Sequence, residues 1–256
     1  MRYQVLGPLR VDRDGAALHV SQPKMRCVLT LLVLHANRVV SKDALVAELW
    51  GDQPPRKAMP TLYVYISQLR KLLGEPDRPH GPIETAPPGY LLRVEPEDVD
   101  WMRLQQLVRR GRAQLEDGRL TQSARTFEEA LGLWYGPTPG PEAVGPAAAG
   151  SLTWLDECRL ECLESYVEAN LQLGRHRTVV SQLVGLVAEN PLHEAFYGQL
   201  MRALQASERR ADALRVYQQA RVVLRRELGL EPGLQLRELQ STLLNTAGPA
   251  RARLVG

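Results

Sequence analysis

RKAMPTLYVYISQLRKLL, at residues 56–73, carries apolar side chains at the spacing that places them on one face of an α-helix. At 100° per residue, Ile66, Leu69 and Leu73 fall within about 40° of Leu62 and form a narrow apolar stripe. Such a stripe is typical of a helix that packs one face against a core. The segment therefore predicts an amphipathic helix.

The opposite face of this predicted helix has a composition suited to DNA. It combines cations, a hydroxyl, an amide and one methyl-bearing side chain, from Lys57, Val64, Ser67, Gln68 and Lys71. Cations suit phosphates, amides suit base edges, and an apolar group suits the methyl of thymine. Tyr63 and Arg70 lie on one flank, within reach of a DNA backbone. Taken alone, the pattern is equally compatible with an ordinary solvated helix face.

Three short β-prone runs precede the helical segments and are separated by Gly-Pro and Asp-Gly turn signals. The runs are residues 2–6, 9–12 and 16–20. A first helix is expected to begin at Pro23 and to continue to about Ala36, with Ser21 as its cap and Asn37 as its stop.

A second helix is expected at residues 42–50, capped by Ser41 and ended by Gly51. The third helix, the one described first, is expected to begin between Ala58 and Pro60. Proline has no amide hydrogen and is tolerated only in the first turn of a helix.

A hairpin is expected at residues 83–94, with its turn at Pro87-Pro88-Gly89. The order is then three strands, three helices and a hairpin, which is a helix-turn-helix with strands on both sides. In that arrangement the third helix enters the major groove of DNA, and the hairpin lies over the backbone or the minor groove as a wing.

These segments resemble the winged-helix effector domain of response regulators. More specifically, they are similar to its version in the Streptomyces antibiotic regulatory protein family. The similarity is carried by QVLGPL (4–9), PKMRCVLTLLVLHANRVVSKDALVAELWG (23–51), TLYVYISQLRKLLG (61–74) and IETAPPGYLL (83–92).

The resemblance implies DNA contacts at matching positions. Groove-facing positions of the recognition helix correspond to Thr61, Val64, Gln68 and Arg70. Backbone-contacting positions correspond to Tyr65 and Ser67, and further phosphate contacts are implied for Trp50 and Lys24. Three of these residues have open alternatives: Trp50 could plug the core, Tyr65 could pack on the wing, and Lys24 could be a solvated cation.

The predicted wing departs from the response-regulator pattern. There the wing often carries an arginine that enters the minor groove, whereas the turn here reads Ala86-Pro87-Pro88 and has no cation. We therefore expect the wing to contact the DNA backbone through Thr85 or to pack against a neighbouring protomer.

Helical periodicity dominates from Val99 to about Leu244, and it repeats. Gly174-Arg175 and Glu208-Arg209 lie 34 residues apart, and Gly118-Arg119 begins an earlier copy. Matching offsets after these pairs hold Ser123, Phe127 and Ala130, then Val179, Leu183 and Leu186, then Ala213, Tyr217 and Ala220. A period of 34 residues is the tetratricopeptide signature. Such arrays offer surfaces to partners and carry no chemistry of their own.

This segment resembles the bacterial transcriptional activation domain. The similarity is carried by VDW (99–101), FEEALGLWYG (127–136), NPLHEAF (190–196) and RRELGLEPGLQLREL (225–239). Two departures are Trp101, where phenylalanine is usual, and Glu208, where glycine is usual. We expect Glu208 to be accommodated in the right-handed helical conformation.

The predicted fold class is therefore mostly α. A winged helix-turn-helix of the response-regulator effector type (α+β) is expected at 1–95, and an all-α tetratricopeptide-like activation domain at 99–246. The insertion at 136–150 is expected to be a loop, and the tail at 247–256 is expected to be disordered.

Charge is distributed unevenly along the chain. Residues 1–95 hold 13 Lys and Arg against 9 Asp and Glu, and the remainder holds 19 against 20. The basic excess thus lies where DNA contact is expected. Apolar runs fall short of the roughly 18 residues of a membrane span, and no leader segment is recognisable, so a cytoplasmic location is expected.

No catalytic or metal-binding constellation stands out in the sequence. Cys158 and Cys162 could share a metal, but two buried thiols are expected, because no histidine or second cysteine pair lies near. No Walker motif is present, and no receiver domain precedes the winged helix. We therefore expect neither a cofactor nor an enzyme activity.

The residues and the family resemblance together predict a transcriptional activator, acting at a secondary-metabolite gene cluster. Its expected partners are double-stranded promoter DNA with direct-repeat sites, neighbouring copies of itself, and RNA polymerase. The resemblance implies that the polymerase contact involves the sigma-factor region that reads the −35 element. Two alternatives stay open. One is a helical scaffold whose winged domain binds protein, and the other is a repressor with the same DNA contacts.

Overall fold

The computed structural model describes residues 1–74, 81–137 and 144–245. Contacts divide the chain into two compact units. One joins Met1–Arg110 with Glu128–Cys162, and the other joins Gly111–Phe127 with Leu163–Gly256. The expected division of the sequence at residues 95–99 stays a prediction, and the two units are described separately below.

The first unit begins with a three-stranded antiparallel sheet, as predicted. Its strands are β1 (Arg2–Gln4), β2 (Arg10–Arg13) and β3 (Ala16–Leu18), in that order. Tyr3 pairs with Val11 across the sheet, and both side chains are buried.

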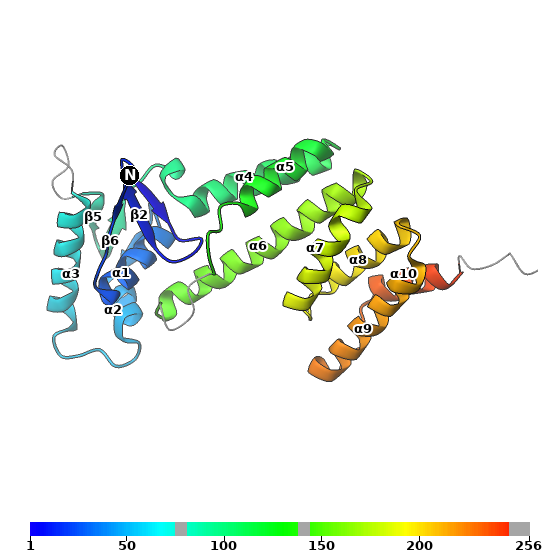
Figure 1. The fold of residues 1–256 in the computed structure, drawn as a ribbon. Helices are drawn as coiled ribbons and strands as arrows, with labels where there is room; N and C mark the ends of the chain where they lie inside the picture. Colours follow the sequence, from blue (N-terminus) through cyan, green and yellow to red (C-terminus); the bar gives the residue numbers. More distant parts are fainter. Residues whose placement is uncertain (75–80, 138–143, 246–256) are drawn as a thin grey trace, which may run out of the picture. The chain divides into compact units, whose positions relative to one another are not determined.

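Three helices follow (Figure 1): α1 (Pro23–Leu34), α2 (Lys42–Trp50) and α3 (Ala58–Leu73). The predicted cap of α2 is confirmed, because Ser41 Oγ accepts a hydrogen bond from the Ala44 N–H at 3.1 Å. The predicted cap of α1 is wrong. Gln22 stands at the cap position and makes no side-chain capping bond, so Ser21 lies one residue too early.

The predicted hairpin is present as β5 (Ile83–Ala86) and β6 (Gly89–Leu92). A strand that we did not predict, β4 (Val39–Ser41), joins it in the order β4-β6-β5. The Val40 carbonyl passes so close to Gly89 that a Cβ there would lie 1.7 Å from its oxygen. Three residues between two helices are too short to show an alternating pattern, so only the pairing with β6 reveals the strand.

The described residues after a short 3-10 turn at Pro96–Asp98 are mainly helical. The helices are α4 (Asp100–Glu116), α5 (Leu120–Leu131), α6 (Pro146–Gln172), α7 (His176–Glu189), α8 (Glu194–Ala206), α9 (Arg210–Leu228) and α10 (Leu234–Asn245). The expectation of a loop through residue 150 is wrong, because α6 already begins at Pro146, where proline suits a first turn. Part of that insertion and the tail at 247–256 lie outside the described residues.

The predicted repeat is confirmed by three equivalent turns. Gly118, Gly174 and Glu208 all have positive φ, at 71°, 74° and 62°. The next N–H reaches the carbonyl five residues back, from Arg119 to Gln114, Arg175 to Asn170 and Arg209 to Leu204. This is the Schellman ending of a helix. The right-handed conformation that we expected for Glu208 is therefore wrong, since the turn imposes a left-handed one.

The residues that define the repeat are also buried. Their relative exposure is 6% or less at Ser123, Phe127, Ala130, Val179, Leu183, Leu186, Ala213, Tyr217 and Ala220. In the second unit, α7, α8, α9 and α10 pack against one another in succession (Figure 1). The alternation of small and large side chains thus serves helix-on-helix packing, as the sequence predicted.

Two buried carboxylates, those of Glu48 and Asp100, form hydrogen bonds between distant segments of the first unit. Glu48 on α2 accepts hydrogen bonds from the N–H groups of Gly145 at 2.6 Å and Ala148 at 3.0 Å, and so caps the first turn of α6. Asp100 accepts bonds from the N–H groups of Val5 at 2.8 Å and Leu6 at 2.9 Å. Both contacts hold elements of the winged helix to residues far along the chain.

Candidate nucleic-acid interface

The α3 helix is amphipathic as predicted. Leu62, Ile66, Leu69 and Leu73 have relative exposures of 2% or less. The opposite face is exposed and comprises Lys57, Val64, Ser67, Gln68 and Lys71. Val64 contributes an aliphatic side chain to this face and is 52% exposed. The contact of this face with DNA stays a prediction.

Thr61, an expected DNA contact in the first turn of α3, makes a hydrogen bond within the protein. Thr61 Oγ1 donates to the Lys57 carbonyl at 2.8 Å. A threonine hydroxyl has one hydrogen, so Thr61 keeps only its acceptor capacity for a ligand. Tyr65, one turn further, is half-buried. The expected DNA roles of both residues stay predictions.

Arg70 joins α3 to the wing. Its Nε donates to the Ile83 carbonyl at 2.9 Å, and its Nη2 donates to Thr85 Oγ1 at 2.8 Å. The guanidinium also lies 5.7 Å from the centre of the Tyr90 ring. The guanidinium has five N–H donors, so some remain for a ligand. The bonds to the hairpin, however, set the direction of the side chain. The structure thus brings Arg70 and Thr85 together and separates Arg70 from the outward row of Val64 and Gln68.

Lys24 and Trp50 meet at the end of α2. The Lys24 ammonium lies 4.6 Å from the centre of the Trp50 ring, and its Nζ donates to the Leu49 carbonyl at 3.3 Å. A cation at a helix C-terminus and over an indole face is favoured by both the helix dipole and the ring. Trp50 is half-exposed, so it is not a core plug, and its predicted phosphate contact stays untested.

A second pair of this kind was missed by the sequence reasoning. Lys42, at the start of α2, lies 5.3 Å from the centre of the Tyr63 ring and 3.5 Å from its hydroxyl. Tyr63 is 45% exposed. Burial raises the pKa of the neighbouring Tyr90, while Lys42 and Arg70 lower it. The helical wheel placed Tyr63 on the flank of α3, but only the packing of α2 on α3 brings Lys42 beside it.

Among the described residues, neither a metal site nor a membrane-spanning helix is found. No group of three or more His, Cys, Asp or Glu side chains is placed there to hold a metal ion. None of the helices in this part of the chain combines the length and the apolar composition that a membrane-spanning segment requires.

Comparison with known proteins assigns both parts of the chain to protein families. Residues 17–92 match the family described as transcriptional regulatory protein, C terminal, and residues 99–244 match the bacterial transcriptional activator domain. The chain is 36% identical to the regulatory protein DnrI of Streptomyces peucetius over 252 residues, which cover 95% of this chain and 92% of DnrI.

Two further relatives are longer than the matched region. The regulatory protein AfsR of Streptomyces griseus is 35% identical over 244 residues, which are 95% of this chain and 24% of AfsR. A solved structure of Mycobacterium tuberculosis EmbR, in complex with a low affinity phosphopeptide, superposes with a TM-score of 0.91 at 33% identity. That match covers 97% of this chain and 66% of the EmbR chain.

Proposed function

The chain is a transcriptional regulator of the Streptomyces antibiotic regulatory protein family, and from this premise we propose that it activates transcription by reading promoter DNA with the exposed face of α3. The observation that carries the proposal is the division of α3 into a buried apolar stripe and an outward row of Val64, Ser67, Gln68 and Lys71. Because the stripe is held in the core, the row must face outward.

The chemistry of this row suits the major groove. Gln68 can bond adenine through both groups of its amide, and Val64 can contact a thymine methyl. Lys71 and Lys57 can neutralise phosphates. Lys24 on α1, beside Trp50, and Lys42 on α2, beside Tyr63, supply further cations. Phosphate contacts then provide most of the affinity, and the outward row provides the choice of sequence.

The wing takes a backbone role in this proposal. Its turn has no cation, and its exposed Thr85 is oriented by Arg70. A hydroxyl suits a phosphate oxygen and carries no sequence information. We therefore assign Thr85 to the DNA backbone and assign Arg70 first to the position of the wing.

The finer partners follow from the family resemblance. Protomers would bind side by side on direct repeats, in the cytoplasm, at the promoters of a secondary-metabolite gene cluster. The helical domain would contact RNA polymerase near the sigma-factor region that reads the −35 element. A contact worth about 1.4 kcal/mol changes promoter occupancy tenfold, so a small interface is enough.

The DNA assignment can be tested on the full chain. Footprinting on the regions upstream of its own and neighbouring genes identifies a site, and mobility shifts then measure affinity. We expect Gln68→Ala to weaken specific binding by about 1–3 kcal/mol. Gln219→Ala, which also removes an exposed amide but from α9, serves as the matched control. Unchanged affinity in a folded Gln68→Ala protein would reject the groove assignment.

Two further measurements separate the alternatives. Affinity for DNA should fall steeply with salt concentration, because bound phosphates release counterions; a scaffold that binds protein through its winged domain would show no such DNA binding. Transcription with purified RNA polymerase should rise when the chain is added. A fall in transcript at the same occupied site would identify a repressor.

A further inference from the structure

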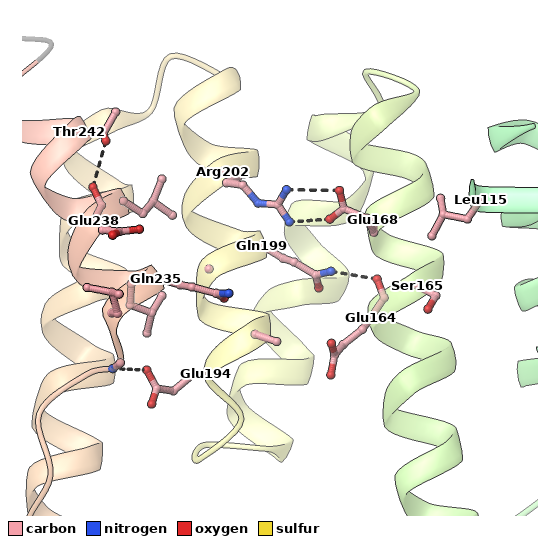
Figure 2. Close-up of a pocket in the computed structure, with 16 residues that line it drawn as sticks. Leu115, Glu164, Ser165, Glu168, Glu194, Gln199, Arg202, Gln235, Glu238 and Thr242 are labelled. Atoms are coloured by element: carbon pink, nitrogen blue, oxygen red, sulfur yellow. Dashed lines mark hydrogen bonds and ion pairs between the residues drawn. The ribbon is translucent and has the colours of Figure 1, made fainter. Parts of the chain in front are cut away.

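A groove crosses α6, α8 and α10 in the second unit (Figure 2), and it has a volume of about 940 Å³. Its lining includes two small residues of α8, Ala195 and Gly198. Leu115, Leu234 and Leu239 add apolar surface. The size lies within the range of binding sites for specific ligands, and the groove is separate from the face of α3 assigned to DNA.

An acceptor without a partner lies in the lining of this groove. Gln199 is only 5% exposed. Its Nε2 donates to the Glu164 carbonyl at 2.9 Å, whereas its Oε1 accepts no hydrogen bond from any residue that the structure describes. Figure 2 shows this side chain reaching from α8 toward α6. Buried polar atoms are nearly always paired, so this oxygen is available to accept a hydrogen bond from a ligand.

The charge of the groove favours a cationic ligand. Four carboxylates line it, from Glu164, Glu168, Glu194 and Glu238, against the single cation Arg202. Arg202 is already paired, with its Nη2 2.5 Å from Glu168 Oε2. Burial alone would raise the pKa of Glu168, but hydrogen bonds from Arg202 and Gln172 hold it below its usual value, so that Glu168 stays ionised. The remaining carboxylates give the rim a negative charge.

Two further carboxylates of the groove, those of Glu194 and Glu164, are held by contacts within the protein. Glu194 Oε2 accepts a hydrogen bond from the Gly233 N–H at 2.7 Å, which ties α8 to the segment before α10. Glu164 contacts the His193 ring. Glu238 is exposed on α10 and has no side-chain bond to the described residues. It is the carboxylate most available to a ligand.

We propose that this groove binds an extended peptide that carries arginine or lysine side chains, with one backbone N–H donating to Gln199 Oε1 and a cation beside Glu238. An extended segment fits better than a helix, because the N–H groups inside a helix are already bonded to its own carbonyls. The partner is therefore a protein with an exposed basic segment, and the apolar lining accommodates an aliphatic side chain next to its cations.

The test uses the full chain and a fluorescein-labelled peptide, Leu-Arg-Ala-Arg-Leu-Ala, with both ends blocked. Fluorescence anisotropy should show saturable binding, and the peptide with glutamate in place of arginine should bind at least tenfold more weakly. Glu238→Gln should weaken binding about two- to fivefold, as expected for an exposed ion pair. Glu189→Gln, an equal change of charge on the exposed face of α7, should leave it unchanged.

The acceptor role of Gln199 is tested from the peptide side, which leaves the protein intact. Analogues methylated at one backbone nitrogen at a time should lose about tenfold in affinity at one position and little elsewhere. Equal affinity of the basic and acidic peptides would overturn the proposal. So would competition by spermidine at equal concentration, which would indicate a site for small cations, or methylated analogues that all bind alike. DNA affinity should be the same for Glu238→Gln and the unmodified chain, so failure of the groove proposal leaves the DNA assignment unaffected.

Discussion

Hydrogen bonds of side chains join residues that lie much farther apart along the chain in the first unit than in the second. In the first unit, Glu48 bonds the Gly145 N–H across 97 residues, and Asp100 bonds the Val5 N–H across 95. In the second unit, the side-chain bonds span little more than one repeat: Gln199 bonds the Glu164 carbonyl across 35 residues, and Glu194 bonds the Gly233 N–H across 39. The winged helix therefore depends on docking of remote segments, whereas the repeat depends on local turns and packing between neighbours. Single substitutions should be more costly in the first unit.

The largest expected effect comes from a close approach of two backbones in the first unit. A Cβ on Gly145 would lie 2.0 Å from the Glu48 carbonyl oxygen. Because backbone cannot give way as a side chain can, we expect Gly145→Ala to lower the free energy of unfolding by about 3 kcal/mol. Urea denaturation followed by circular dichroism measures it.

The matched control lies inside α6, about one turn after Gly145. A Cβ on Gly150 meets nothing within 4 Å. Gly150→Ala should therefore be neutral or stabilising by up to about 1 kcal/mol, since alanine loses less entropy in a helix. Equal stability of the two alanine variants would show that α6 does not dock on α2 as described.

A pH dependence is expected from Asp100. Burial raises its pKa from 3.8 to about 6, although the N–H groups of Leu6, Val5 and Trp101 lower it. The folded state thus binds this proton more tightly, so its contribution to stability is fully present below about pH 4 and is lost as the pH rises through about 6. A shift of this size corresponds to about 2–3 kcal/mol.

The comparison of two chains isolates this contribution. Denaturation midpoints between pH 4 and pH 7 should fall more steeply with pH for the unmodified chain than for Asp100→Asn, which cannot ionise at that position. Parallel pH profiles for the two proteins would contradict the assignment.

Removal of the Glu48 carboxylate should have an intermediate effect. It would leave the Gly145 and Ala148 N–H groups without their partner, at a cost of about 2 kcal/mol. Thermal unfolding of Glu48→Ala should show the loss. Glu189→Ala, on an exposed surface of α7, should change stability by less than about 0.5 kcal/mol. Similar losses of stability in both variants would contradict the claim that the first unit depends on docking of remote segments.

The smallest effect is expected at a turn of the second unit, and it is a gain. Glu208 adopts a φ of 62°, where the equivalent Gly118 and Gly174 have no side chain to strain. Glu208→Gly should stabilise the chain by about 1 kcal/mol. The reverse change in an equivalent turn, Gly174→Ala, should destabilise it by a similar amount. A loss of stability in Glu208→Gly, measured by urea denaturation, would show that the glutamate side chain makes up for its strained backbone.

Local signals explain which parts of the fold could be predicted. The stripe of Leu62, Ile66, Leu69 and Leu73 and the cap at Ser41 depend on residues within a few positions of one another, and both are confirmed. The strand at Val39–Ser41 was missed because three residues carry no period of their own. The start of α6 at Pro146 was missed for a related reason. Its composition indicates a loop, and a carboxylate on α2 caps it.

The candidate site divides in the same way. The outward row of α3 could be read from the helical wheel, because spacing along one helix decides which side chains share a face. The direction of Arg70 could not, since it depends on the Ile83 carbonyl and on Thr85 in the hairpin. Lys42 was missed because only the packing of two helices brings it to Tyr63.

The sequence by itself determined the amphipathic third helix, the order of winged helix and repeat, and the family, because these rest on periodicity and motifs that short segments carry. Tertiary structure alone decided that Arg70 holds the wing, that Glu48 caps α6, and that Gln199 leaves a buried acceptor in a groove with an acidic rim. Those three depend on which distant segments meet, and contacts between remote segments leave no periodic signal along a single chain.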